Sequence, residues 1–157
     1  MAQEPTDEPI RQAVTVPVPV DQAFAAFADL AGWWPREYTW AADTLEDIGI
    51  DPREGGHCYE RGPLGFTCHW GRVLAWEPPT RLAFTWQIAP DRVPEPNPAK
   101  ASEVEVRFQP AGASGTRVEL EHRALARHGE AADAYRDGLT SPEGWPLILG
   151  RYAATLR

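Results

Sequence analysis

The stretch Trp70-Gly-Arg-Val-Leu-Ala-Trp-Glu-Pro-Pro-Thr-Arg-Leu-Ala-Phe-Thr-Trp86 is the most informative part of this chain. It holds three of the seven tryptophans and a Pro-Pro turn. After the turn, apolar side chains alternate strictly in the order Leu82, Phe84, Trp86 and Ile88, which places all four on one face of a strand. A face this wide and aromatic must be covered, either by the rest of the chain or by a ligand.

Length and composition predict one globular domain. The chain has 157 residues, of which 43% are hydrophobic and 24% charged, an ordinary globular composition. The net charge of −8 argues against nucleic acid or an anionic membrane as a partner. Residues 1–9 are acidic and contain proline, so we expect a disordered tail and then a single domain over residues 10–157. The sequence shows no signal-peptide pattern and no apolar run of about twenty residues, so we expect a cytoplasmic location.

Alternating apolar residues predict a series of strands joined by hairpins. We expect strands over residues 10–16, 44–50, 57–60, 66–76, 81–89, 103–108 and 116–122. A short helix is expected over 22–29 with Asp21 as its N-cap, and a long helix over 141–156 with Ser141 as its cap and Pro142 at its first position. Because no βαβ crossover repeats, the sheet should be antiparallel, with one face covered by the last helix.

Seven short motifs along the chain carry a family resemblance. They are Val16-Pro-Val-Pro-Val-Asp-Gln-Ala-Phe24, Gly32-Trp-Trp-Pro35, Gly55-Gly56, Trp70-Gly-Arg-Val-Leu-Ala-Trp-Glu-Pro-Pro79, Glu103-Val-Glu-Val-Arg-Phe108, Gly115-Thr-Arg-Val-Glu-Leu-Glu-His122 and Gly144-Trp-Pro146. Together they resemble the START-like (SRPBCC) superfamily, in the branch related to the activator of the 90-kDa heat-shock chaperone ATPase. The resemblance covers the chain from about Ile10 to its end.

The resemblance implies an α+β helix-grip fold. In this fold a curved antiparallel sheet of six to seven strands wraps around a long C-terminal helix and leaves a cavity between them. Members of the superfamily bind lipids, polyketides, plant hormones and other apolar molecules, and some catalyse cyclisation or aromatisation without a cofactor. Founding members of this branch assist a chaperone. The family therefore specifies the fold much better than the activity.

We expect the ligand site to lie between the concave sheet face and the last helix. Its predicted lining residues are Trp33, Trp70, Phe84, Trp86, Phe108, Leu120, His122, Trp145 and Leu149. His122 continues the inward series of Val118 and Leu120, so it is either a polar anchor for a ligand or a structural histidine at the rim. The tryptophans either border the pocket or fill the core. Glu60 also points inward in one register of its strand.

Two histidines and two cysteines at first suggest a zinc site, but strand geometry argues against it. If the loop after Arg61 is centred on Pro63, Cys58 opposes Cys68 and His57 opposes His69. The thiols then share one face of the sheet and the imidazoles the other, so the four side chains cannot meet one metal ion. We expect no metal, and two thiols in or near the core that could form a cross-strand disulfide on oxidation.

The sequence favours a binding protein for a small hydrophobic or aromatic molecule, without a cofactor. One alternative is a cofactor-independent enzyme of the polyketide cyclase or aromatase type, which requires an inward acid or base. The other is a co-chaperone-like module that binds a protein partner, for which the sequence gives no direct support. The sequence contains no glycine-rich phosphate-binding loop before a helix, which argues against nucleotide binding. It also contains no nucleophile-elbow pattern, which argues against a catalytic serine.

Overall fold

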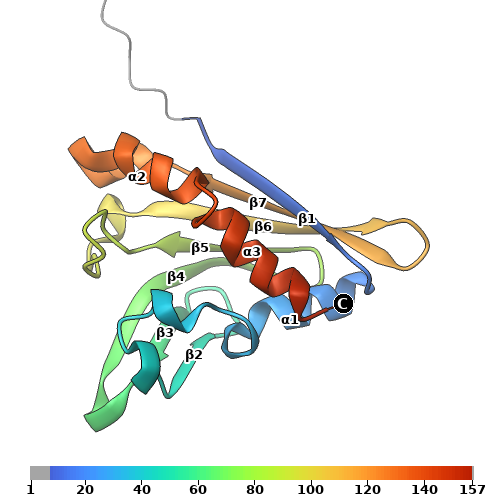
Figure 1. Ribbon diagram of the computed structural model, residues 1–157, viewed down its shortest axis with the longest axis horizontal. Coiled ribbons are helices and arrows are strands. Elements are labelled where there is room, and N and C mark those ends of the chain that lie inside the picture. Colours follow the sequence, from blue (N-terminus) through green and yellow to red (C-terminus); the bar gives the residue numbers. More distant parts are fainter. Residues whose placement is uncertain (1–7, 157) are drawn as a thin grey trace, which may run out of the picture.

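Seven strands form one antiparallel sheet in the computed structural model, which describes residues 8–156 (Figure 1). The strands are β1 (Ile10–Val16), β2 (Asp47–Ile50), β3 (His57–Arg61), β4 (Thr67–Glu77), β5 (Arg81–Trp86), β6 (Ser102–Ala111) and β7 (Gly115–Arg123). Their order is β1-β7-β6-β5-β4-β3-β2, so the first strand pairs with the last. This curved sheet is the one that the alternating pattern and the resemblance predict.

Helices cover one face of the sheet. The α-helices are α1 (Val20–Ala28), α2 (Ala132–Thr140) and α3 (Trp145–Ala154). Short 3₁₀ segments are η1 (Leu30–Gly32), η2 (Arg36–Tyr38), η3 (Ala42–Thr44), η4 (Pro63–Gly65), η5 (Pro98–Lys100) and η6 (Leu125–Ala131). Figure 1 shows α3 crossing the sheet face and ending near α1, with α2 continuing the same layer at the other end. The strands therefore grip a C-terminal helical layer, as the helix-grip prediction states.

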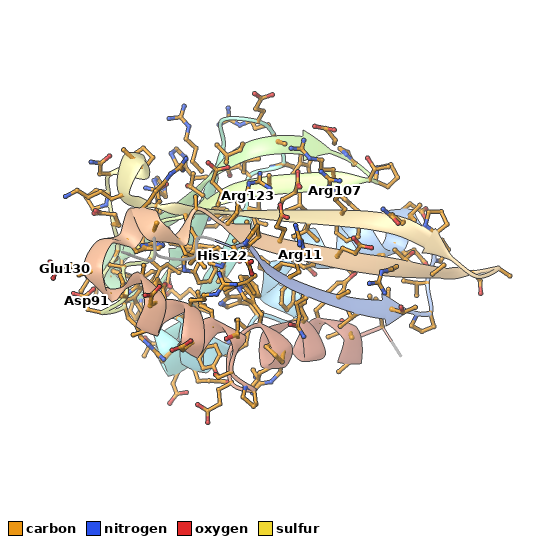
Figure 2. All side chains as sticks on the ribbon, turned by 90° about the horizontal axis from the view of Figure 1, so that it is seen from above. Arg11, Asp91, Arg107, His122, Arg123 and Glu130 are labelled. Atoms are coloured by element: carbon orange, nitrogen blue, oxygen red, sulfur yellow. The ribbon has the colours of Figure 1, made fainter. Side chains whose placement is uncertain are left out.

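The alternation in each strand separates an apolar inner face from a charged outer face. On β7, Val118, Leu120 and His122 are buried against the helices. On the outer face, the nearly buried carboxylate of Glu105 contacts Arg81, Arg107 and Arg123. Figure 2 shows His122 between the sheet and the helices and the labelled arginines on the sheet's other side. A core of aliphatic and aromatic side chains, including Phe27, Phe84, Phe108 and Trp145, fills most of the space beneath the sheet.

Both predicted helix caps are wrong. Helix α1 begins at Val20 after Pro19, and Asp21 lies inside its first turn without a side-chain capping bond. Helix α3 begins at Trp145 after Gly144, while Ser141 ends α2 and donates its hydroxyl to the Gly138 carbonyl. The reason is the tight turn between the two helices: a Cβ placed on Gly144 would lie 2.2 Å from the Leu139 carbonyl oxygen. Pro142 therefore precedes the helix, and Pro146 occupies its first turn, where no backbone N–H is needed.

The predicted pairing of β3 with β4 is also wrong in register, although not in facing. Cys58 opposes Gly71, and Cys68 opposes Glu60, because the hairpin turns further along the chain and a bulge follows Cys58. The shift at the hairpin is an even number of residues, so each side chain keeps its face. The two cysteines are buried and free, and the rings of His57 and His69 stack 4.2 Å apart on the outer face.

Two other expectations concern the ends of the chain and the membrane. The predicted tail over residues 1–9 lies outside the described residues except for Glu8 and Pro9. Within residues 8–156, no helix is long and apolar enough to cross a bilayer.

Candidate functional site

A cavity of about 540 Å³ lies between the inner face of the sheet, the helix α2 and the beginning of α3. Its wall also includes the segment around η2 and the linker that follows β5. This volume lies within the range of roughly 300–1,000 Å³ that is typical of sites for small organic ligands. A packed core lies beside it, so the cavity occupies one end of the helical layer.

Three tryptophans, Trp34, Trp70 and Trp86, form one side of the cavity, which we call the tryptophan wall. The rings of Trp34 and Trp70 are stacked, with centroids 5.6 Å apart and planes inclined by 30°. The ring of Trp86 lies 6.0 Å from that of Trp70 and 6.3 Å from that of Trp34. Each ring packs on the other two, and the three side chains are only 2–8% exposed, so the wall is tightly packed and contributes a narrow aromatic strip to the cavity.

Glu60 is the buried carboxylate of the cavity. Strand β3 turns its side chain inward, and the residue is only 1% exposed. Its Oε1 accepts the backbone N–H of Trp40 at 3.1 Å, and its Oε2 accepts that of Ala41 at 3.0 Å. Glu60 thereby ties the segment between η2 and η3 to the sheet, and it also lines the cavity.

Tyr135 holds helix α2 over the tryptophan wall. The indole N–H of Trp86 donates to the Tyr135 hydroxyl at 2.6 Å, and that hydroxyl donates to the Ile88 carbonyl at 2.8 Å. Burial raises the pKa of Tyr135 to about 12, although the bond from Trp86 acts in the opposite direction. The tyrosine is therefore a neutral crosslink between α2, the end of β5 and the linker.

Two further hydrogen bonds join the segments at the rim. The Tyr38 hydroxyl donates to the Glu143 carbonyl at 2.7 Å, which links η2 to the turn before α3. The Trp40 indole N–H donates to the Arg92 carbonyl at 2.7 Å, which links the segment after η2 to the linker. The cavity mouth is thus framed by side chains from segments that lie far apart in the sequence.

His122 lies in the core next to this cavity and does not line it. Its Nδ1 accepts the Trp145 indole N–H at 3.0 Å, so the ring proton is on Nε2, which donates to the Ser102 hydroxyl at 2.7 Å. Ser102 in turn donates to Nε2 of His128 at 2.7 Å. Burial, with a smaller effect from His128, lowers the pKa of His122 to about 3. The sequence left a structural histidine at the rim as one alternative, whereas the structure places His122 in the core with both ring nitrogens hydrogen-bonded.

The structure brings two of the predicted lining residues, Trp70 and Trp86, to the cavity. The others lie in the packed core beside it and outside its lining: Trp33, Phe84, Phe108, Leu120, His122, Trp145 and Leu149. Trp33, for example, packs between Phe27 and Tyr152, and its indole N–H is donated to backbone carbonyls of α1.

Sequence reasoning missed Trp34, Tyr135 and the segment around η2 as parts of the site. Trp34 adjoins Trp33 in the Gly32-Trp-Trp-Pro35 motif, and the pattern gave no way to choose between the two rings. Tyr135 is the one aromatic residue in the polar stretch over residues 127–138. Its position among polar residues was the only feature of the sequence that could have suggested a role in the site.

The described residues offer no obvious metal site. Within residues 8–156, no three His, Cys, Asp or Glu side chains gather closely enough to hold a metal ion. The cysteines lie on the inner face of β3 and β4, whereas His57 and His69 stack on the outer face. Burial raises the pKa of the Cys58 thiol well above its usual range, and burial with the nearby charge of Glu60 raises that of Cys68 to about 11.

The chain belongs to the Activator of Hsp90 ATPase homolog 1-like protein family, whose model matches residues 17–157. This match confirms the resemblance that the motifs carry. A search of curated proteins gave no match.

Several solved structures have the same architecture. The chain is similar to Txn09, described as an anthrahydroquino-γ-pyrone synthase complexed with SUM, with 37% identity over 95% of this chain and 98% of that one and a TM-score of 0.64. It is also similar to CalC, a self-sacrificing resistance protein from Micromonospora echinospora, with 27% identity, coverage of 96% and 94%, and a TM-score of 0.65. A protein from Nitrosomonas europaea, NE0264, shares the fold at 20% identity, with coverage of 98% and 96% and a TM-score of 0.66.

Proposed function

We propose that this protein binds a flat aromatic molecule of two or more fused rings in the cavity beside the tryptophan wall. The observation that carries the proposal is a 540 Å³ cavity with three mutually packed indoles on one side. Stacking and the burial of apolar ligand surface would supply most of the affinity, at roughly 25 cal/mol per Å² before the costs of ordering. The name of Txn09 denotes a fused aromatic product, which supports the same ligand class.

A substitution that fills the cavity tests this proposal. Gly138 lies in α2 and lines the cavity, and a Cβ placed on it meets no other atom within 4 Å. The variant Gly138→Leu should therefore fold normally, because replacing a helical glycine favours the helix. Its side chain should occupy the mouth of the cavity and compete with a ligand.

Equilibrium dialysis with 2-naphthol measures the effect. We expect Gly138→Leu to weaken binding by about tenfold or more, the equivalent of about 1.4 kcal/mol. The matched control is Gly150→Leu, since Gly150 lies in α3 with similar free space and outside the cavity lining. The control should bind within about twofold of the wild type. Absence of binding to the wild-type protein, or equal binding by all three proteins, would refute the proposal.

A second candidate function is cyclisation of an aromatic precursor held in the same cavity. It is favoured by the 37% identity to a named synthase over nearly the whole chain and by a buried carboxylate in the cavity wall. In this case Glu60, and not His122, is the residue placed to accept a proton from the bound molecule. The test is product formation, followed by mass spectrometry, with an aromatic polyketide precursor and the wild type or Gly138→Leu. The co-chaperone-like alternative stays a prediction.

A further inference from the structure

The inner face of β3 carries a charged residue where its neighbours are apolar. Glu60 stands opposite Ile48 of β2 and Cys68 of β4, and all three are buried. No ion pair involving Glu60 is found within residues 8–156, whereas the buried Glu105 on the outer face contacts three arginines. A carboxylate that is buried without a cation is costly, so its hydrogen bonds must offset the loss of water.

The hydrogen bonds in the structure occupy only some of the acceptor positions of the Glu60 carboxylate. A carboxylate group has about four acceptor positions, and the N–H groups of Trp40 and Ala41 occupy one on each oxygen. Acceptor capacity therefore remains on a group that lines the cavity.

Four polar side chains of the cavity wall donate their protons to groups other than Glu60. The hydroxyl protons of Tyr38 and Tyr135 are donated to the carbonyls of Glu143 and Ile88. The indole protons of Trp40 and Trp86 are donated to the Arg92 carbonyl and the Tyr135 hydroxyl. These four side chains have no proton left for Glu60, so a hydroxyl group of a molecule bound in the cavity is a suitable donor for its free acceptor positions.

We propose that Glu60 is a specificity-determining residue that accepts a hydrogen bond from a hydroxyl group on the aromatic ligand. The inference rests on the proposed function and names its ligand class more narrowly: phenols with fused rings. Such a molecule places its rings against the tryptophan wall and its hydroxyl on the carboxylate. An aromatic hydrocarbon of the same shape leaves the carboxylate buried with unused acceptors, and a ligand carboxylate in that position meets a like charge.

The test compares two ligands of nearly the same shape, 2-naphthol and 2-methylnaphthalene. The methyl compound is the more hydrophobic, so transfer from water alone favours it. A wild-type preference for 2-naphthol of about tenfold is expected in equilibrium dialysis, since a hydrogen bond to a charged group has this strength. Binding of both compounds within about threefold would overturn the role of Glu60 and leave the proposed function intact. Binding of neither would overturn both.

The variant Glu60→Gln tests whether the preference for 2-naphthol over 2-methylnaphthalene depends on this carboxylate. It keeps the shape and one acceptor for the backbone, and it should reduce the preference to about threefold or less while 2-methylnaphthalene binds as before. The control is Glu46→Gln, which removes a carboxylate from an exposed position beside β2. The control should keep the wild-type preference. A tenfold preference in Glu60→Gln would contradict the proposal.

A second variant covers the case in which Glu60→Gln loses both ligands because the segment at Trp40 and Ala41 is released. Glu60→Asp keeps the carboxylate on a shorter side chain. In that case, a retained preference for 2-naphthol in Glu60→Asp supports the proposal, and equal binding of the two compounds refutes it.

Discussion

At the scale of single residues, the buried chain Trp145–His122–Ser102–His128 determines how the protein responds to acid. Each hydrogen bond in the chain fixes the direction of the next, because Trp145 has only a donor and must face an unprotonated Nδ1 of His122. His122 is therefore neutral. Its side chain is also fully buried. A proton added to it would break one of these bonds and place a charge in the core.

The fold should therefore lose stability below neutral pH. The pKa of His122 is lowered by burial from 6.5 to about 3, so the unfolded chain takes up a proton at a higher pH than the folded one. The stabilising contribution is complete above pH 6.5 and is lost as the pH falls from there towards 3. Between pH 7 and 5 the loss from this one group is about 2 kcal/mol. Burial also lowers the pKa of His128, which acts in the same direction.

The variant His122→Gln tests this dependence. We expect it to be less stable than the wild type at pH 7 by about 1–3 kcal/mol, because buried polar partners lose hydrogen bonds. Its free energy of unfolding, measured by urea denaturation, should vary less between pH 7 and 5 than that of the wild type. The same pH dependence in both proteins would show that His122 does not hold its neutral form in the fold.

At the scale of secondary-structure elements, α2 is attached to the sheet through few polar contacts, of which Tyr135 is central. The change Tyr135→Phe removes the acceptor for the Trp86 indole and the donor to Ile88. An unpaired buried N–H costs about 1–3 kcal/mol. We expect faster hydrogen exchange in amides 132–140, with exchange in β6 and β7 unchanged. A uniform increase across the sheet, or no change in α2, would contradict this role for Tyr135.

The sequence predicts strands better than helix ends, for a physical reason. Strand alternation reflects which face is buried, so it located all seven strands within a few residues and placed Val118, Leu120 and His122 inward. A helix cap depends on how the chain enters the helix. The close approach of Gly144 to the Leu139 carbonyl decides where α3 begins, and this contact is not visible in a pattern of residue types.

The register of β3 and β4 could not be read from the sequence for a similar reason. A bulge after Cys58 and the position of the hairpin turn set the pairing. The bulge also shifts the alternation of β4, where the consecutive residues Trp70 and Gly71 are both buried, and a pattern of residue types does not show where such a shift falls. The cysteines could be predicted to share one face and the histidines the other, since facing depends on the period of two, whereas the facing of Glu60 stayed open until the register was known.

At the scale of the whole molecule, the order of elements was enough to predict the fold but not the position of the cavity. The predicted lining assumed that most inward aromatics surround one space. In the structure, α1 and α3 fill most of this space with Phe27, Leu149 and Tyr152, and the cavity lies at the end covered by α2. Its wall comes from six separated parts of the chain, and the distances between them could not follow from local patterns.

The crystal structure of the protein with 2-naphthol tests the central claim most directly. We predict that the naphthalene rings lie against Trp34, Trp70 and Trp86, beneath Tyr135, with the hydroxyl oxygen within about 3 Å of a Glu60 carboxylate oxygen, the usual distance for such a bond. A structure in which the ligand binds elsewhere, or in which the cavity is closed by the protein's own side chains, would contradict the account.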